Sequence, residues 1–142
     1  FVQHHSVDLN GDGREDLVAN AFGDGLFGDA QALLSVWYQE PEFAAARAAA
    51  PATIPPGSLP GFREQVIAAD SGLIGSVVGD FTGDGRPDIA AVIAQARQEL
   101  VLFVNEGDER FSRHVLDRHT PSWGGNSLRA AVTGYLRTLA DE

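Results

Sequence analysis

The sequence predicts an all-β fold made of two units, each with about four antiparallel strands. An Asp- and Gly-rich motif occurs twice, beginning at Asp8 and at Asp80. Short apolar runs that are bounded by turn residues follow each copy, as expected for strands. These runs come in the same order after both motifs, which indicates an internal repeat.

Both motifs have the form D-x-[N/T]-G-D-G-x-x-D. Oxygen-bearing side chains at positions 1, 3, 5 and 9 can converge on one hard cation, while the glycines let the chain turn sharply. Helix-flanked calcium loops begin similarly but need an acidic ligand at position 12, where this chain has Ala19 and Ala91. The alternative is a turn without an ion. Its three carboxylates would repel one another, so such a turn should loosen.

Three strands are expected after each motif, and one strand leads into it. The matching segments are 17–22 and 89–94, 33–38 and 100–104, 61–67 and 110–116, and 4–7 and 74–79. The third pair shares the spacing F-x-x-x-V-[I/L]. Four antiparallel strands per unit is the composition of a β-propeller blade. We therefore expect two propeller-type blades, which form an incomplete propeller.

The first unit is longer because an Ala/Pro-rich insertion spans 41–61. We expect a short helix over 42–50, followed by an extended proline-rich loop on the rim of the sheet. An interdomain linker is the alternative, but strands match on both sides of the insertion. The expected divisions are a first blade over 1–66, a second over 67–126 and a tail over 127–142.

The tail has two interpretations. A short helix over 127–140 would place its apolar residues on one face. The alternative is a degenerate third repeat, in which 131–135 corresponds to the start of the second motif. Ala131, Tyr135 and Leu139 would then occupy the ligand positions. None of these side chains binds calcium, so neither interpretation predicts a metal there.

Composition narrows the possible partners. The chain has 142 residues, is 44% hydrophobic and has a formal net charge of −10. Such acidity argues against nucleic acid and anionic membranes, which require basic patches. No apolar run approaches the roughly 20 residues of a membrane span. The absence of Cys excludes thiolate metal sites. The chain opens inside a motif at Phe1 and without Met, so we expect a mature, processed or partial chain.

The two motifs with their apolar sequels, D-L-N-G-D-G-R-E-D-L-V and D-F-T-G-D-G-R-P-D-I-A, resemble FG-GAP or VCBS-type repeats. Such repeats form propeller blades, including those of integrin α-chains and many secreted bacterial proteins. Phe22-Gly23 also matches a frequent feature of that family. The resemblance implies two Ca²⁺ sites, whose ligands would be Asp8, Asn10, Asp12, Asp16 and the Arg14 carbonyl, and Asp80, Thr82, Asp84, Asp88 and the Arg86 carbonyl.

The second of these sites should be weaker, because the neutral hydroxyl of Thr82 is a poorer ligand than Asn or Asp. Gly13 and Gly85 would take positive φ angles. The resemblance implies a calcium-stabilised, non-catalytic scaffold or binding module of an extracellular, periplasmic or cell-surface protein, such as a cell-adhesion protein. Millimolar calcium outside the cytoplasm suits such loops.

Two blades cannot close a ring, so each should expose an apolar face. The expected partners are therefore further blades, a protein partner or a glycan. Two alternatives remain open. One is a carbohydrate-active propeller, either a lectin or part of a polysaccharide lyase. The other is an accessory subunit of a larger complex, whose neighbours would cover the apolar faces.

Overall fold

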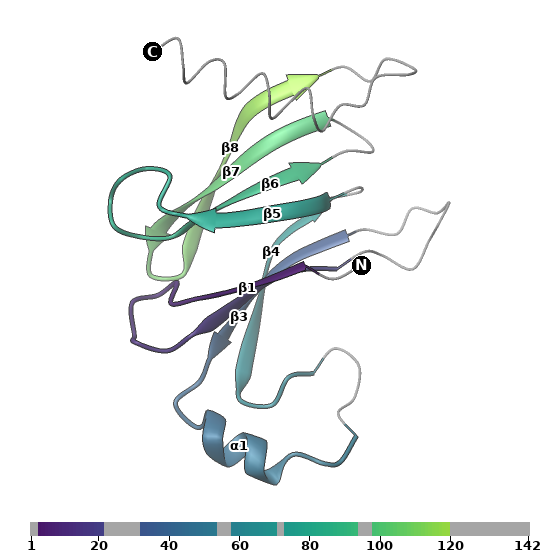
Figure 1. Ribbon diagram of the computed structural model, residues 1–142, viewed down its shortest axis with the longest axis vertical. Coiled ribbons are helices and arrows are strands. Elements are labelled where there is room, and N and C mark those ends of the chain that lie inside the picture. Colours follow the sequence, from purple (N-terminus) through teal and green to yellow (C-terminus); the bar gives the residue numbers. More distant parts are fainter. Residues whose placement is uncertain (1–2, 22–31, 54–57, 71–72, 94–97, 120–142) are drawn as a thin grey trace.

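A computed structural model of the chain describes residues 3–21, 32–53, 58–70, 73–93 and 98–119 (Figure 1). Their elements are β1 (Gln3–Val7), β2 (Asp16–Ala21), β3 (Ala32–Gln39), α1 (Phe43–Ala49), β4 (Phe62–Asp70), β5 (Leu73–Gly79), β6 (Asp88–Ile93), β7 (Gln98–Gly107) and β8 (Arg110–His119). The strands form two antiparallel sheets in the orders β1-β2-β3-β4 and β5-β6-β7-β8. The predicted all-β fold with two four-stranded units is confirmed.

The strand before each motif belongs to the same sheet as the strands after it. The motif is the loop of a hairpin, in which β1 pairs with β2 and β5 pairs with β6. Segment 74–79 therefore lies in the first strand of the second sheet. Strand β4 continues to Asp70, so the division expected after residue 66 falls inside this strand.

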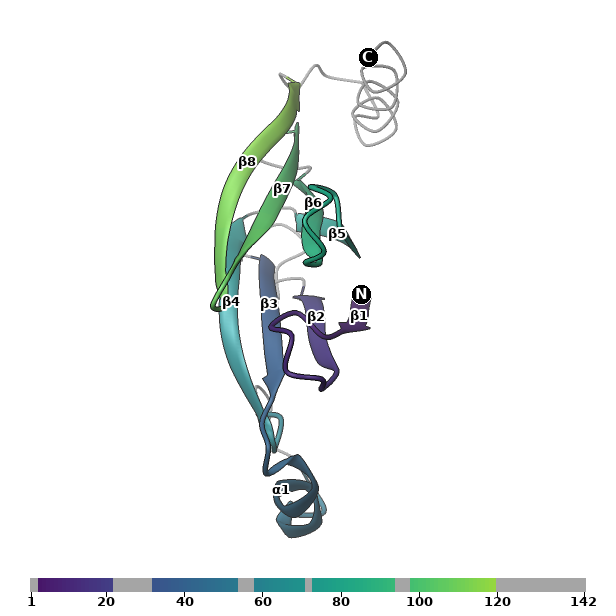
Figure 2. The same ribbon diagram turned by 90° about the vertical axis from the view of Figure 1, so that its left-hand side faces the viewer.

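The insertion forms the short helix that the sequence predicts, α1, and it lies beyond the lower end of the first sheet (Figures 1 and 2). It is joined to the start of β4 by an edge-to-face contact of Phe43 and Phe62, whose ring centroids lie 5.2 Å apart. Gly61 has a φ of 82°, and an added Cβ would come within 2.8 Å of the Phe43 Cα. Only glycine allows this close approach.

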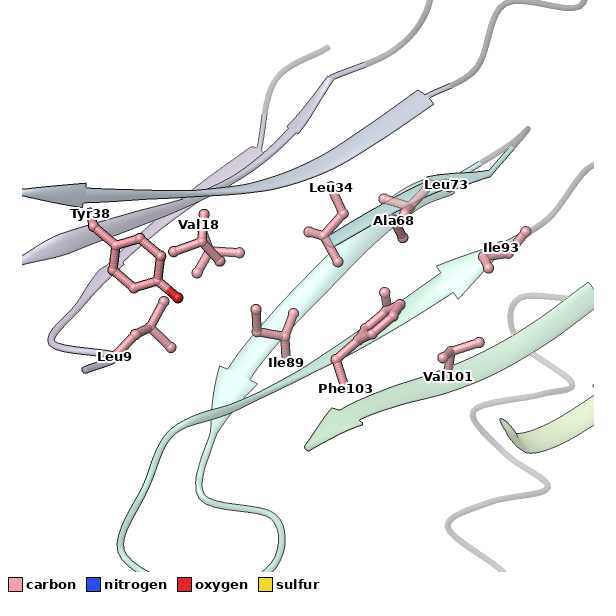
Figure 3. Packing of buried hydrophobic residues seen from close by; sticks show 12 residues of the cluster. Leu9, Val18, Leu34, Tyr38, Ala68, Leu73, Ile89, Ile93, Val101 and Phe103 are labelled. Carbon is pink, nitrogen blue, oxygen red and sulfur yellow. The ribbon is translucent and has the colours of Figure 1, made fainter. Parts of the chain in front are cut away.

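The two sheets stack face to face around one buried cluster. Figure 2 shows β1 and β5 along one edge of the stack, with β4 and β8 along the other. Figure 3 shows side chains of both sheets in the cluster between them. The first sheet supplies Val18, Leu34, Val36, Tyr38 and Ala68, and the second supplies Leu73, Ile89, Ala91, Ile93, Val101 and Phe103.

The two sheets are stacked in the same orientation. After the last aspartate of each motif, the buried residues are Val18 and Asn20 in β2, but Ile89, Ala91 and Ile93 in β6. The second motif follows the first by 72 residues, so Val18 corresponds to Ala90. Ala90 lies on the side of β6 opposite to the buried Ile89 and Ala91, because successive side chains of a strand point to opposite faces. We call the side with Val18 in the first sheet and Ala90 in the second the front face, and the opposite side the back face. The front face of the first sheet thus packs against the back face of the second.

Several expectations fall on residues outside the described part. They are Phe22-Gly23 and both interpretations of the tail over 127–142. Within the described part, α1 is far too short to cross a membrane, and no helix there is both long and apolar enough to do so. The two sheets do not form a closed ring among the described residues.

Candidate metal-binding loops

The two motifs form hairpin loops with nearly the same backbone. The first loop, 8–15, joins β1 to β2, and the second loop, 80–87, joins β5 to β6. Both lie toward the left in Figure 1. As the resemblance implies, Gly13 and Gly85 have positive φ angles of 82° and 85°. An added Cβ would meet nothing within 4 Å at either position. The need for glycine there comes from the backbone conformation and not from lack of space.

The carboxylate at position 1 holds each loop closed. Asp8 accepts hydrogen bonds from the backbone N–H groups of Gly11 (2.8 Å), Asp12 (3.2 Å) and Gly13 (2.8 Å). Asp80 accepts the same three bonds in the second loop, from the N–H groups of residues 83 to 85. These bonds, with that from Gly85 contributing most, hold the pKa of Asp80 below its ordinary value.

Position 7 is an arginine in both loops, and its side chain ties the loop to the rest of its sheet. Arg14 donates from Nε to the carbonyl oxygen of Gln39 at 2.9 Å, and Arg86 donates to that of Asn105 at 2.8 Å. The guanidinium of Arg14 also contacts the Asp12 carboxylate, and Arg86 contacts Asp84 in the same way. The guanidinium of the arginine at position 7 therefore places a positive charge beside the carboxylate of the aspartate at position 5.

Position 9 is a carboxylate with no solvent exposure. Asp16 and Asp88 are both 0% exposed. Asp16 accepts from the backbone N–H groups of Leu9 and Gln39, both at 2.9 Å. Asp88 accepts three such bonds, including one of 2.8 Å from the N–H of Asn105. Each of these residues thus joins its loop to the adjacent strand, β3 or β7.

The Asp16 carboxylate has no cation to balance its charge, because none of the salt bridges among the described residues includes it. Burial raises its pKa above the ordinary value of 3.8. The two backbone hydrogen bonds oppose this shift, whereas the negative charges of Asp12 and Asp8 add to it. The ionised form of Asp16 is therefore destabilised where it lies.

Glu99 on β7 shows the usual arrangement of a buried carboxylate. Its side chain is 1% exposed and is paired with the guanidinium groups of Arg113 and Arg118, at 2.8 and 2.7 Å. Burial alone would raise the pKa of Glu99, but the two arginines outweigh it and lower the pKa. A charged group that is removed from water normally has such a partner or binds a metal. Among the described residues, Asp16 has no such charged partner.

Four of the sequence-predicted ligands lie in each loop, and the fifth, Asp16 or Asp88, is the first residue of the strand that follows. In the described part of the chain, no three acidic, His or Cys side chains already form a metal cage. The donor chemistry nevertheless fits a hard cation. A carboxylate has about four acceptor sites, so Asp8 keeps spare capacity beside its three N–H bonds. A bound ion would take the place that the Arg14 guanidinium holds at Asp12.

One residue that the sequence did not single out connects the two sheets. Asn105 at the end of β7 is 1% exposed, and its Nδ2 donates to the carbonyl oxygen of Leu9 in the first loop at 2.8 Å. The same nitrogen donates to the Pro87 carbonyl at 3.1 Å, while its Oδ1 accepts from the N–H of Gly107 at 3.0 Å. A polar residue that directly follows the apolar run 100–104 was the available signal.

Comparisons with models of protein families, with characterised proteins and with solved structures find no match to this chain. The interpretation of the loops therefore depends on their own geometry and chemistry.

Proposed function

We propose that each loop binds Ca²⁺ and that the chain is a non-catalytic, calcium-stabilised binding scaffold with propeller-type blades, from an extracellular, periplasmic or cell-surface protein. One observation carries the proposal. The Asp16 carboxylate is 0% exposed, and its ionised form is destabilised first by burial and then by the negative charges of Asp12 and Asp8. A divalent cation among these three groups would turn the repulsion into attraction.

The proposed role of calcium is structural. Asp16 links the first loop to β3 through its bond with the Gln39 N–H, so an ion held there would couple the hairpin to the neighbouring strand. In the second loop, Thr82 replaces Asn10 of the first, and its hydroxyl is the weaker donor. We therefore propose a tighter first site and a weaker second site, with affinities in the range of about 0.1 to 1 mM that extracellular modules use.

Calorimetric titration and thermal melting of the full chain test this proposal. A site that is saturated at about 100 times its Kd adds about 2.7 kcal/mol to stability, which is about 5 to 10 °C in Tm for a chain of this size. Asp12→Asn should remove most of this gain at the first site, and Asp84→Asn should remove the smaller gain at the second.

Glu15→Gln provides the matched control. Glu15 is exposed, lies in the same loop and is outside the proposed ligand set, so this change removes the same charge without removing a ligand. Its calcium titration should match that of the unmodified chain. Equal melting curves in calcium and in chelator would refute the proposal, as would equal losses for Glu15→Gln and Asp12→Asn.

A further inference from the structure

The contact between the two sheets buries the position-2 side chain of the first loop but leaves that of the second loop exposed. Leu9 at position 2 of the first loop is 4% exposed and belongs to the buried cluster together with Ile89 of the second sheet. Asn105 of the second sheet binds its carbonyl oxygen. Phe81 holds the corresponding position in the second loop and is 48% exposed. A large apolar side chain thus projects where the repeat has a buried one.

The first sheet carries the counterpart of the surface that covers Leu9. Leu17 corresponds to Ile89 on the back face, since the two lie 72 residues apart. Gln39 corresponds to Asn105, because its backbone binds the arginine and the last aspartate of its own loop in the same way. A loop that approached this face as the first loop approaches the second sheet would place its position-2 side chain at Leu17.

An apolar hollow is present at that place. It has a volume of about 290 Å³ and is lined mainly by Leu17, Phe43, Leu59 and Phe62. Three of these residues belong to the α1 insertion and the start of β4, where the second sheet has only a tight turn between β7 and β8. The insertion therefore widens the receiving surface, and the side chain to be received is Phe81, which is larger than Leu9.

Ser76 and His4, which correspond to each other in the two sheets, show the same match between a larger side chain and a hollow that could receive it. Between the sheets, the small Ser76 of β5 meets the first sheet through its hydroxyl, which donates to Asn20 at 2.7 Å, and through its N–H, which donates to Gln3 at 3.1 Å. His4 corresponds to Ser76 in the first sheet and is exposed. The surface it would meet is a hollow of about 280 Å³ on the front face of the second sheet, lined in part by Gly75 and Val92.

We propose that a second copy of this chain docks head to tail on the first, with Phe81 of one copy seated in the hollow at Leu17 of the other. The back face of one copy's first sheet then covers the front face of the other copy's second sheet, which repeats the contact inside each chain. Such an interface joins two different surfaces, so it propagates until a ring closes. Propellers have about four to eight blades, so about two to four copies would complete one.

Each copy has a net charge of −10, so association should strengthen with ionic strength as salt screens the repulsion between copies. The inference rests on the correspondence between the two sheets and does not require that the loops bind calcium. Measurements in calcium and in chelator therefore separate it from the function proposed above.

Sedimentation velocity of the full chain over a range of concentrations tests the proposal. Phe81→Ser should raise the dissociation constant at least about tenfold, because it removes the aromatic anchor of the interface. Because Phe81 is half exposed, the variant should keep its fold, and circular dichroism checks this. Val115→Ser is the matched control, since Val115 is another exposed apolar residue (39%) but lies on β8, away from the proposed surfaces. It should associate as the unmodified chain does.

Mixing two defective variants gives the decisive measurement. Leu59→Asp blocks the hollow and keeps Phe81, whereas Phe81→Ser keeps the hollow. Each should be monomeric alone, and an equimolar mixture should form a dimer that grows no further. A chain that stays monomeric at all concentrations would overturn the proposal. It would also be overturned if Phe81→Ser associated as well as Val115→Ser, or if the mixture stayed monomeric.

Discussion

Replacement of Asn105 by Ala tests how the two sheets are held together. This side chain makes three hydrogen bonds, two as donor to the carbonyl oxygens of Leu9 and Pro87 and one as acceptor from the N–H of Gly107. Each such bond contributes about 0.5 to 1.5 kcal/mol net, and the buried Leu9 carbonyl would lose a partner. We expect a loss of about 2 to 4 kcal/mol in the free energy of unfolding, or about 5 to 15 °C in Tm.

The assay is urea unfolding in calcium-free buffer, followed by circular dichroism, with Gln39→Ala as control. Gln39 makes the same backbone contacts with its own loop, but its described hydrogen bonds come from its backbone alone. Its replacement should cost less than about 0.5 kcal/mol, as for most surface changes. Asn105→Asp should be at least as harmful as Asn105→Ala, because it sets a buried carboxylate against two carbonyl oxygens.

The reasoning would be refuted if Asn105→Ala and Gln39→Ala had equal effects, or if Asn105→Ala cost less than about 0.5 kcal/mol. Either result would mean that the amide bridge from β7 to the first loop adds nothing to the apolar contact between the sheets.

Two further predictions concern the loops. The raised pKa of Asp16 means that, without calcium, its contribution to stability is full below the ordinary pKa of 3.8 and is lost as the pH rises through the raised value. In chelator, acidification from pH 7 should therefore stabilise the unmodified chain more than it stabilises the Asp16→Asn variant. It should also reduce the stabilisation by calcium, because calcium binding needs the ionised carboxylate. A Tm difference between the unmodified chain and Asp16→Asn that does not change with pH would contradict this. Gly85→Ala should cost about 1 to 2 kcal/mol because its φ is 85°, whereas Gly85→Asn should cost less in the same urea assay, since Asn tolerates left-handed conformations; equal costs would point to a cause other than the backbone.

The local geometry of the loops was within reach of the sequence. A carboxylate at position 1 and glycines at positions 4 and 6 act over at most five residues, and the same three N–H bonds to that carboxylate form in both copies of the motif. The short helix after residue 42 follows from an alanine-rich segment in the same way. The four-stranded units also follow from local patterns, because apolar runs and turn residues mark each strand.

The grouping of strands and the joining of the sheets depended on contacts between distant residues. The sequence could not say which strands pair with one another, because periodicity marks a strand but not its partner, so the pairing of β5 with β6 came from the structure. The bond between Asn105 and Leu9 spans 96 positions, and only the stacking of the sheets brings these residues together. The same stacking buries Leu9 and leaves Phe81 exposed, although both occupy position 2 of one motif. Local chemistry thus determined the shape of each loop, whereas the packing of one sheet on the other decided which position-2 side chain was buried.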